Sequence, residues 1–182
     1  MSGDRYSGKL EGLLTVPLIG AGLTALFAII PRIDPRSDNL VRSQKAYFMT
    51  ALAAMGLLLS IHASTVLQAL GWQINVATVV SVGVSVLLAV IGNYLGKVRS
   101  NFTFGLRIPW TLSSEQSWNK THRLGGRLLF LLGISGIIAA LANANQLFLL
   151  LILGGTVSLT IILIIYSYVV WRDDPERQRI ER

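Results

Sequence analysis

Two long stretches of this chain contain no charged residue, one from residue 46 to 96 and the other from residue 128 to 171. Over the whole chain 14% of residues are charged and 52% are hydrophobic, whereas an average soluble domain has about 25% charged residues. Each charge-free stretch is too long for one membrane helix of about 20 residues, so each is predicted to cross the bilayer twice. The sequence therefore indicates an integral membrane protein.

Local breaks in hydropathy divide the chain into helices. Polar but uncharged residues interrupt the two charge-free stretches at 71–75 and 143–146, which predicts tight hairpin loops. An earlier apolar segment ends at Pro31 and the charged residues after it, because prolines and charges do not continue a membrane helix. The predicted fold is an all-α, polytopic transmembrane helix bundle with five spans, at about residues 11–31, 46–70, 74–96, 126–142 and 147–171.

The positions of lysine and arginine predict the orientation. They gather in the first loop, in the loop 97–125 with its flank, and in the charged tail 172–182, while the two hairpins contain none. The positive-inside rule places those three segments in the cytoplasm and residues 1–10 outside as a short tail. The net charge of +7 is then explained by the anionic inner leaflet of the lipid bilayer, so no direct binding of nucleic acid is expected.

The loop between the third and fourth spans is rich in aromatic and basic residues. Residues 97–127 read KVRSNFTFGLRIPWTLSSEQSWNKTHRLGGR. Pro109, followed by the capping-box pattern of Ser113 and Gln116, predicts a short interfacial helix at about 114–123. Such a helix would hold the tryptophans of the loop at the depth of the lipid head groups.

Several side chains of this loop are candidates for a binding site. Glu115, Trp118 and His122 have the spacing of one helix face. One interpretation is that Arg107, Glu115, His122 and Arg123 form a polar cluster that binds a partner or transmits a signal. The other interpretation is that this segment is a structural element at the membrane interface.

Two polar residues lie within the predicted spans. His62 is the only titratable side chain deep in a span, tyrosines aside, and Asn93 lies near the inner end of the third span. Such groups either serve a function or form a hydrogen bond with a neighbouring helix. The chain has no cysteine and no catalytic, metal-binding or phosphate-loop motif, so neither an enzyme nor a cofactor is expected.

Between residues 93 and 126 the chain carries a dense set of specific residue types, namely Asn93, Gly96, Asn101, Gly105, Arg107, Pro109, Trp110, Thr111, Leu112, Glu115, Trp118, Thr121, His122, Arg123 and Gly126. This set resembles the signature of the SdpI family of bacterial polytopic membrane proteins. The resemblance implies a candidate partner or ligand site made of Asn93, Asn101, Arg107, Pro109, Trp110, Thr111, Glu115, Trp118, His122 and Arg123. Family members usually have six spans, so the resemblance also implies that a first helix has been lost or trimmed here.

The resemblance implies a function as well. The family's namesake protects a bacterium from a secreted toxic peptide, and it draws a transcriptional repressor to the membrane. We therefore expect a multi-pass protein of the cell membrane that confers resistance to an antimicrobial peptide and recruits a cytoplasmic regulator. One alternative is a small transporter or channel subunit that uses His62 and Asn93. Another is a membrane enzyme acting on lipid head groups, with His122 or Glu115 as acid or base.

Overall fold

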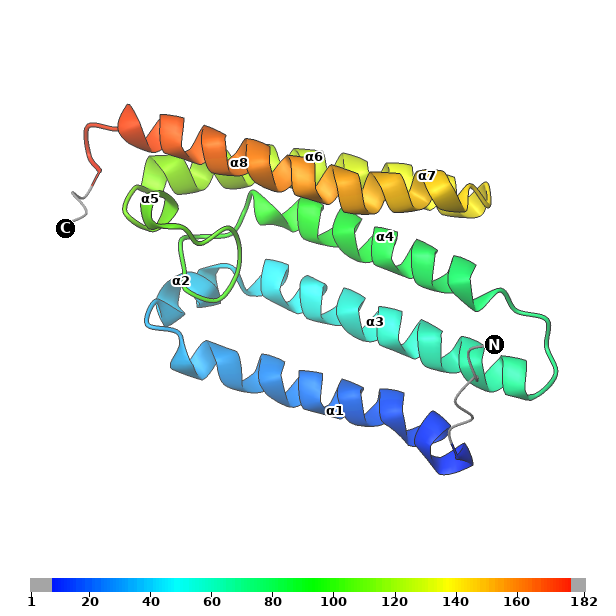
Figure 1. Ribbon diagram of the computed structural model, residues 1–182. Coiled ribbons are helices and arrows are strands. Elements are labelled where there is room, and N and C mark those ends of the chain that lie inside the picture. Colours follow the sequence, from blue (N-terminus) through cyan, green and yellow to red (C-terminus); the bar gives the residue numbers. More distant parts are fainter. Residues whose placement is uncertain (1–7, 178–182) are drawn as a thin grey trace.

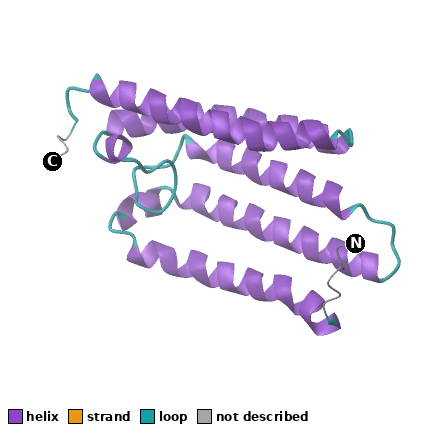
Figure 2. Ribbon diagram, in the orientation of Figure 1, coloured by secondary structure: helices purple, strands orange, loops and turns teal. Residues whose placement is uncertain are grey.

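All regular structure in the described part of the chain is helical (Figure 2). The computed structural model describes residues 8–177, so most of the predicted outer tail and the end of the charged tail lie outside the described residues. The elements are α1 (Lys9–Ile33), α2 (Ser37–Arg42), α3 (Gln44–Ala69), α4 (Val76–Leu95), α5 (Pro109–Leu112), α6 (Glu115–Leu141), α7 (Asn145–Leu149), the π-helical segment η1 (Leu150–Gly154) and α8 (Gly155–Arg172).

Five helical segments are long and apolar enough to cross a membrane. They are α1, α3, α4, α6 and the continuous run formed by α7, η1 and α8. An α-helix rises about 1.5 Å per residue, so about 20 residues span the hydrocarbon layer. The prediction of an all-α protein with five spans is confirmed, and the chain is a multi-pass membrane protein.

The long helices lie side by side in the order in which they occur in the chain. α1 packs on α3, α3 on α4, α4 on α6, and α6 on α8, as Figure 1 shows. Each helix therefore packs mainly against the helix before it and the helix after it. This arrangement leaves broad apolar faces open, for example at Leu18, Leu59 and Ile138, which are each more than half exposed. In a membrane these faces would contact lipid.

The closest approach between two helices is the contact of α4 with α6. A Cβ atom added to Gly92 would lie 2.3 Å from the backbone nitrogen of Phe130, and one added to Gly133 would lie 2.5 Å from that of Ala89. Lipid gives apolar helices no hydrophobic reason to associate, so membrane helices use small residues to bring their backbones into contact. Gly92 and Gly133 are two such residues.

α6 begins earlier than the sequence predicted. Its first residue is Glu115, and the hydroxyl of Ser114 caps it by accepting the N–H of Ser117 at 2.9 Å. The loop before α6 does contain a short helix, but this is α5, which starts at Pro109. The predicted position at 114–123, and with it the cap at Ser113, was wrong, because those residues form the first turns of α6.

The glycine pair in α6 explains this difference. Gly125 and Gly126 lie where the predicted surface helix, 114–123, gives way to the predicted span, 126–142. In the structure both are helical, and each meets a neighbouring helix: a Cβ atom at Gly125 would lie 2.7 Å from Leu163 of α8, and one at Gly126 would lie 2.7 Å from the carbonyl oxygen of Gly92. Tertiary packing therefore overrides the weak helix propensity of glycine.

Candidate functional site

The segment between α4 and α6, residues 96–114, is called the end loop here, and it includes α5. It lies across one end of the row of helices, next to α2 and to the end of α8 (Figure 1). A loop in such a place has few backbone partners of its own, and each buried N–H or carbonyl without a partner would be destabilising. The hydrogen bonds of the end loop are therefore informative about its function.

Asn101 organises the first half of the end loop from within. Its side chain is fully buried. The amide oxygen accepts the N–H groups of Thr103 at 2.8 Å and Phe104 at 2.7 Å, and the amide nitrogen donates to the carbonyl oxygen of Arg99 at 2.8 Å. One side chain thus replaces the backbone partners that a helix or strand would have supplied.

The corner between α1 and α3 supplies further partners. The carboxylate of Asp34 accepts the N–H of Phe102 at 3.2 Å and the hydroxyl of Thr103, and the hydroxyl of Ser43 accepts the N–H of Arg99 at 2.9 Å. Asp34 and Ser43 are both buried. These bonds fix the end loop to the first part of the chain, more than fifty residues away in sequence.

His122 and Trp118 hold the middle of the end loop against α6. Both are buried to 1% exposure, and their rings stack with centroids 3.9 Å apart. His122 accepts the N–H of Leu106 at Nε2 (3.0 Å), so its Nδ1 carries the hydrogen that it donates to the carbonyl oxygen of Trp118 (2.7 Å). The indole of Trp118 donates to the carbonyl oxygen of Val98 at 2.8 Å. This pattern requires a neutral imidazole, because a protonated ring would have two donors.

α5 connects the end loop to α8. The hydroxyl of Thr111 accepts the N–H of Ile108 at 3.1 Å and lies 2.8 Å from the carbonyl oxygen of Leu106. The indole nitrogen of Trp110 donates to the hydroxyl of Ser167, on α8, at 2.6 Å. The end loop is thus bonded to the start of the row, to α6 and to the last helix.

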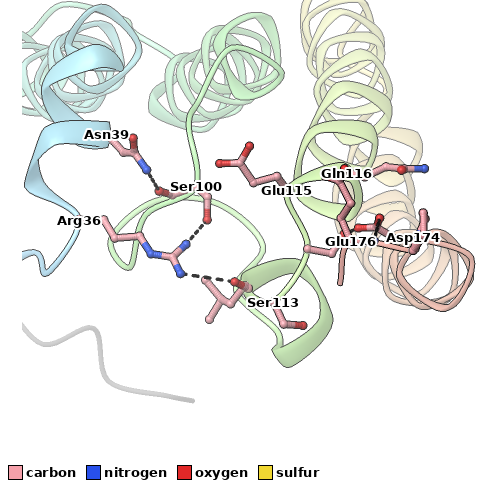
Figure 3. A pocket seen from close by; sticks show the side chains of 11 residues that line it. Arg36, Asn39, Ser100, Ser113, Glu115, Gln116, Asp174 and Glu176 are labelled. Carbon is pink, nitrogen blue, oxygen red and sulfur yellow. Dashed lines mark hydrogen bonds between the residues drawn. The ribbon is translucent and has the colours of Figure 1, made fainter. Parts of the chain in front are cut away.

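A polar cavity of about 700 Å³ opens beside this network. We call it the end cavity, and Figure 3 shows its side chains. Arg36 lies on one wall and donates to the hydroxyl of Ser100 and to the carbonyl oxygen of Leu112. The opposite wall carries three carboxylates, those of Glu115, Asp174 and Glu176. The end cavity therefore places one cation opposite three carboxylates, of which those of Glu115 and Glu176 are exposed and that of Asp174 is buried.

Two acidic residues of the end cavity, Asp174 and Glu115, differ in their hydrogen bonding. The hydroxyl of Ser114 donates to the carboxylate of Asp174 and accepts the N–H of Ser117, so this wall is tied to the cap of α6. Glu115 is exposed, and no described residue forms a hydrogen bond with its carboxylate. Glu115 is therefore free to bind a group that enters the end cavity.

The structure brings together four of the predicted site residues. Asn101, Thr111, Trp118 and His122 are all buried within or beneath the end loop. Trp110 is half-buried at the contact with α8, and Pro109 is the exposed first residue of α5. These residues therefore build the end loop rather than line an open site.

The other predicted site residues lie apart from that interior. Arg107 is exposed and donates to the carbonyl oxygen of Phe102, Glu115 lines the end cavity, and Asn93 and Arg123 line a groove between α4 and α6. His122, in contrast, is buried. The predicted polar cluster of Arg107, Glu115, His122 and Arg123 is therefore not formed, because successive residues of α6 face the end loop, the solvent and α4 in turn.

His62 is remote from the end loop. It lies on α3 and lines an apolar groove of about 430 Å³ beside α1, together with Val16 and Met55. Its Nδ1 atom is buried without a hydrogen-bond partner among the described residues. Nδ1 of His62 therefore does not form the hydrogen bond to a neighbouring helix that a purely structural role would require.

Within residues 8–177 there is no group of three or more His, Cys, Asp or Glu side chains placed to hold a metal. Both nitrogens of His122 are already engaged in hydrogen bonds. Proton transfer by His122 would require the bond to Leu106 to break first.

Sequence reasoning missed the partners of the end loop on other helices. Asp34 and Ser43 lie in the first predicted loop, and Ser114 lies at the start of the predicted helix 114–123, with nothing to mark them as partners of the end loop. Ser167 is one of several residues with a hydroxyl group in the last predicted span, so it did not stand out in the sequence. Nothing in the sequence indicated which distant N–H groups these side chains would bind.

Gly105 provides a test of this packing. It has a φ of +111°, and a Cβ atom there would lie 2.3 Å from Nε2 of His122, whereas Gly71 has a φ of +92° and open space around it. Gly105→Ala and Gly71→Ala should share a backbone penalty of about 1–2 kcal/mol. Gly105→Ala should lose about 1–3 kcal/mol more through overpacking. Unfolding free energies measured in detergent micelles check this, and equal losses in the two variants would show that the ring of His122 is not packed on Gly105.

Comparisons with known proteins match the part of the chain that contains the end loop. Residues 97–167 match the SdpI/YfhL protein family. The protein of Bacillus subtilis (strain 168) named immunity protein SdpI is 29% identical over 162 residues, which cover 89% of this chain and 76% of that relative. No solved structure is significantly similar to this chain. The segment that contains the end loop, α6 and most of α8 thus carries the match to the SdpI/YfhL family, and the chain is distantly similar to that immunity protein.

Proposed function

We propose that this protein confers resistance to a secreted antimicrobial peptide from within the cell membrane and reports the peptide to a cytoplasmic regulator. The observation that carries the proposal is the similarity to a protein named for immunity, which extends over 89% of the chain. The end loop carries most of the residues of the family signature. Its hydrogen bonds to several helices suggest how binding of the peptide in the membrane is passed on to the regulator.

The peptide would bind between α1 and α3. The groove there is lined almost entirely by apolar side chains, among them Val16 and Leu59, and has a volume of about 430 Å³. A hydrophobic segment of a peptide can bury its side chains in such a groove. The Nδ1 atom of His62 is buried without a partner in the described part of the chain, so a peptide that separates α1 from α3 would supply its hydrogen bond.

The end loop would carry the signal. It is bonded to the α1–α3 corner through Asp34 and Ser43, to α6 through His122, and to α8 through Trp110. A peptide that separates α1 from α3 moves this corner, and the end loop moves with it. The end cavity, which the end loop partly lines, then changes shape and serves as the docking site for the regulator.

The proposal requires the end loop to face the cytoplasm, as the distribution of basic residues predicts. Because the chain has no cysteine, single cysteines can report the orientation. A cysteine replacing Trp72, in the α3–α4 hairpin, should react with a membrane-impermeant maleimide added to intact cells, and one replacing exposed Arg99 should react only after lysis. The opposite pattern would contradict both the orientation and the recruitment of a cytoplasmic partner.

A substitution at Glu115 tests whether recruitment of the regulator can be lost while protection from the peptide is kept. In a peptide-sensitive strain that lacks its own immunity protein, the unchanged chain should restore growth in the presence of a sporulation-delay-type peptide. Glu115→Lys reverses a free charge in the end cavity, so it should reduce membrane recruitment of a fluorescently tagged regulator about tenfold or more and leave growth unchanged. The matched control is Asp38→Lys, which makes the same charge change at an exposed residue of α2 outside the end cavity.

Two results would contradict the proposal. If the unchanged protein is produced in the membrane but gives no protection, immunity is the wrong function. If Asp38→Lys reduces recruitment as much as Glu115→Lys, the regulator responds to net charge and not to the end cavity.

The two alternative functions have less support. A transporter needs a path through the protein. Here the helices form an open row, and the apolar groove between α1 and α3 faces the surrounding lipid. A lipid-modifying enzyme needs a free acid or base, and His122 is held by two hydrogen bonds. Neither alternative explains why the end loop is bonded to so many helices.

A further inference from the structure

A second polar feature lies on the lipid side of α4 and α6, outside the end loop. The two helices form a groove of about 320 Å³. Its side chains include one amide, three cations and one aromatic ring, namely Asn93, Lys97, Arg123, Arg127 and Phe130. These three cations do not line the end cavity, and the proposed immunity function assigns them no role.

Glycines explain why this groove stays open. A Cβ atom at Gly96 would lie 3.1 Å from the Cα atom of Arg123, and one at Gly92 would lie 2.3 Å from the backbone nitrogen of Phe130. The helices therefore meet backbone to backbone, and no side chain fills the space above the contact. Arg123 and Arg127 are one helical turn apart on α6, so they project from the same wall.

The three cations have no carboxylate partner. Lys97, Arg123 and Arg127 are all exposed, and the one ion pair found among the described residues joins Arg172 to Asp173, elsewhere. The ammonium of Lys97 instead lies 5.1 Å from the centre of the Tyr94 ring. Like charges that line one recess raise its positive potential and attract an anion.

The order of groups along the groove identifies the anion. The cations lie toward the end loop, where the helices leave the membrane, and Phe130, which is 39% exposed, lies toward the middle of the helices. A phospholipid has this polarity, since its phosphate lies at the membrane surface and its acyl chains point inward. A free phosphate ion has no apolar part that would contact the exposed ring of Phe130. Guanidinium groups also match phosphate oxygens by bidentate hydrogen bonds.

We propose that this groove binds one anionic phospholipid, with the phosphate held by Lys97, Arg123 and Arg127 and an acyl chain lying along Phe130. Asn93 donates its amide hydrogens to the ester or head-group oxygens. The lipid then bridges α4 and α6 beside the end loop, because Lys97 is the second residue of that loop and Arg123 follows His122, which holds the N–H of Leu106. This site does not depend on the proposed immunity function.

The test uses the full chain in a mild detergent with equal amounts of phosphatidylglycerol and phosphatidylcholine, and it measures bound lipid by native mass spectrometry. The unchanged protein should retain phosphatidylglycerol in about tenfold preference. The triple variant Lys97→Gln, Arg123→Gln, Arg127→Gln should lose the preference. An equal preference in this variant would overturn the proposal and leave the cations as ordinary flanking charges.

A matched control separates the groove from overall charge. The variant Arg42→Gln, Lys45→Gln, Arg99→Gln removes three exposed cations at the same end of the molecule but outside the groove. It should keep the preference for phosphatidylglycerol. If it loses the preference as fully as the groove variant does, binding is non-specific attraction to a basic surface.

Two further measurements complete the test. Inorganic phosphate at millimolar concentration should not displace the lipid, and full displacement would make free phosphate the ligand.

The unchanged protein also provides a readout that needs no substitution, in case the triple variant fails to fold. In nanodiscs, acetylation of Lys97 relative to Lys45 by a water-soluble reagent should be several-fold slower with phosphatidylglycerol than with phosphatidylcholine. An equal ratio in the two lipids would overturn the proposal.

Discussion

The hydrogen bonding of the end loop by buried side chains is the constraint on which the rest of this end of the structure depends. A loop without helix or strand partners leaves many N–H and carbonyl groups to be satisfied. Here Asn101 and Thr111 satisfy them from within, His122 does so from α6, and Asp34 and Ser43 do so from the α1–α3 corner. Loss of one partner leaves a buried group unpaired, at a cost of about 1–3 kcal/mol. The loop is therefore held in one shape.

This constraint gives the family signature a physical meaning. Trp118 and His122 have the residue types of a catalytic or ligand-binding pair, yet both are buried and each holds a backbone group of the end loop. The residues open to solvent, such as Glu115 and Arg123, lie on the two sides of that buried core. The structure therefore separates residues that shape the loop from residues available to a partner or a lipid.

The sequence predicted the five membrane helices because long apolar stretches have few other solutions, and it identified the end loop because its composition differs from its surroundings. It did not predict that α6 continues through Gly125 and Gly126, since that depends on how closely α4 and α8 approach. The contributions of Asp34 and Ser167 also escaped prediction. Their partners lie about sixty residues away, and a single sequence does not reveal such pairs.

Amide hydrogen exchange of the protein in lipid nanodiscs tests the central claim most directly. The N–H groups of Phe104, Leu106 and Ile108 are bonded to buried side chains, so they should exchange slowly, at rates close to those of helical amides. The N–H of Gln73, in the α3–α4 hairpin, provides the fast reference. If the three end-loop amides exchange as fast as Gln73, the end loop is not a fixed element, and an account in which it joins the helices and carries a signal is contradicted.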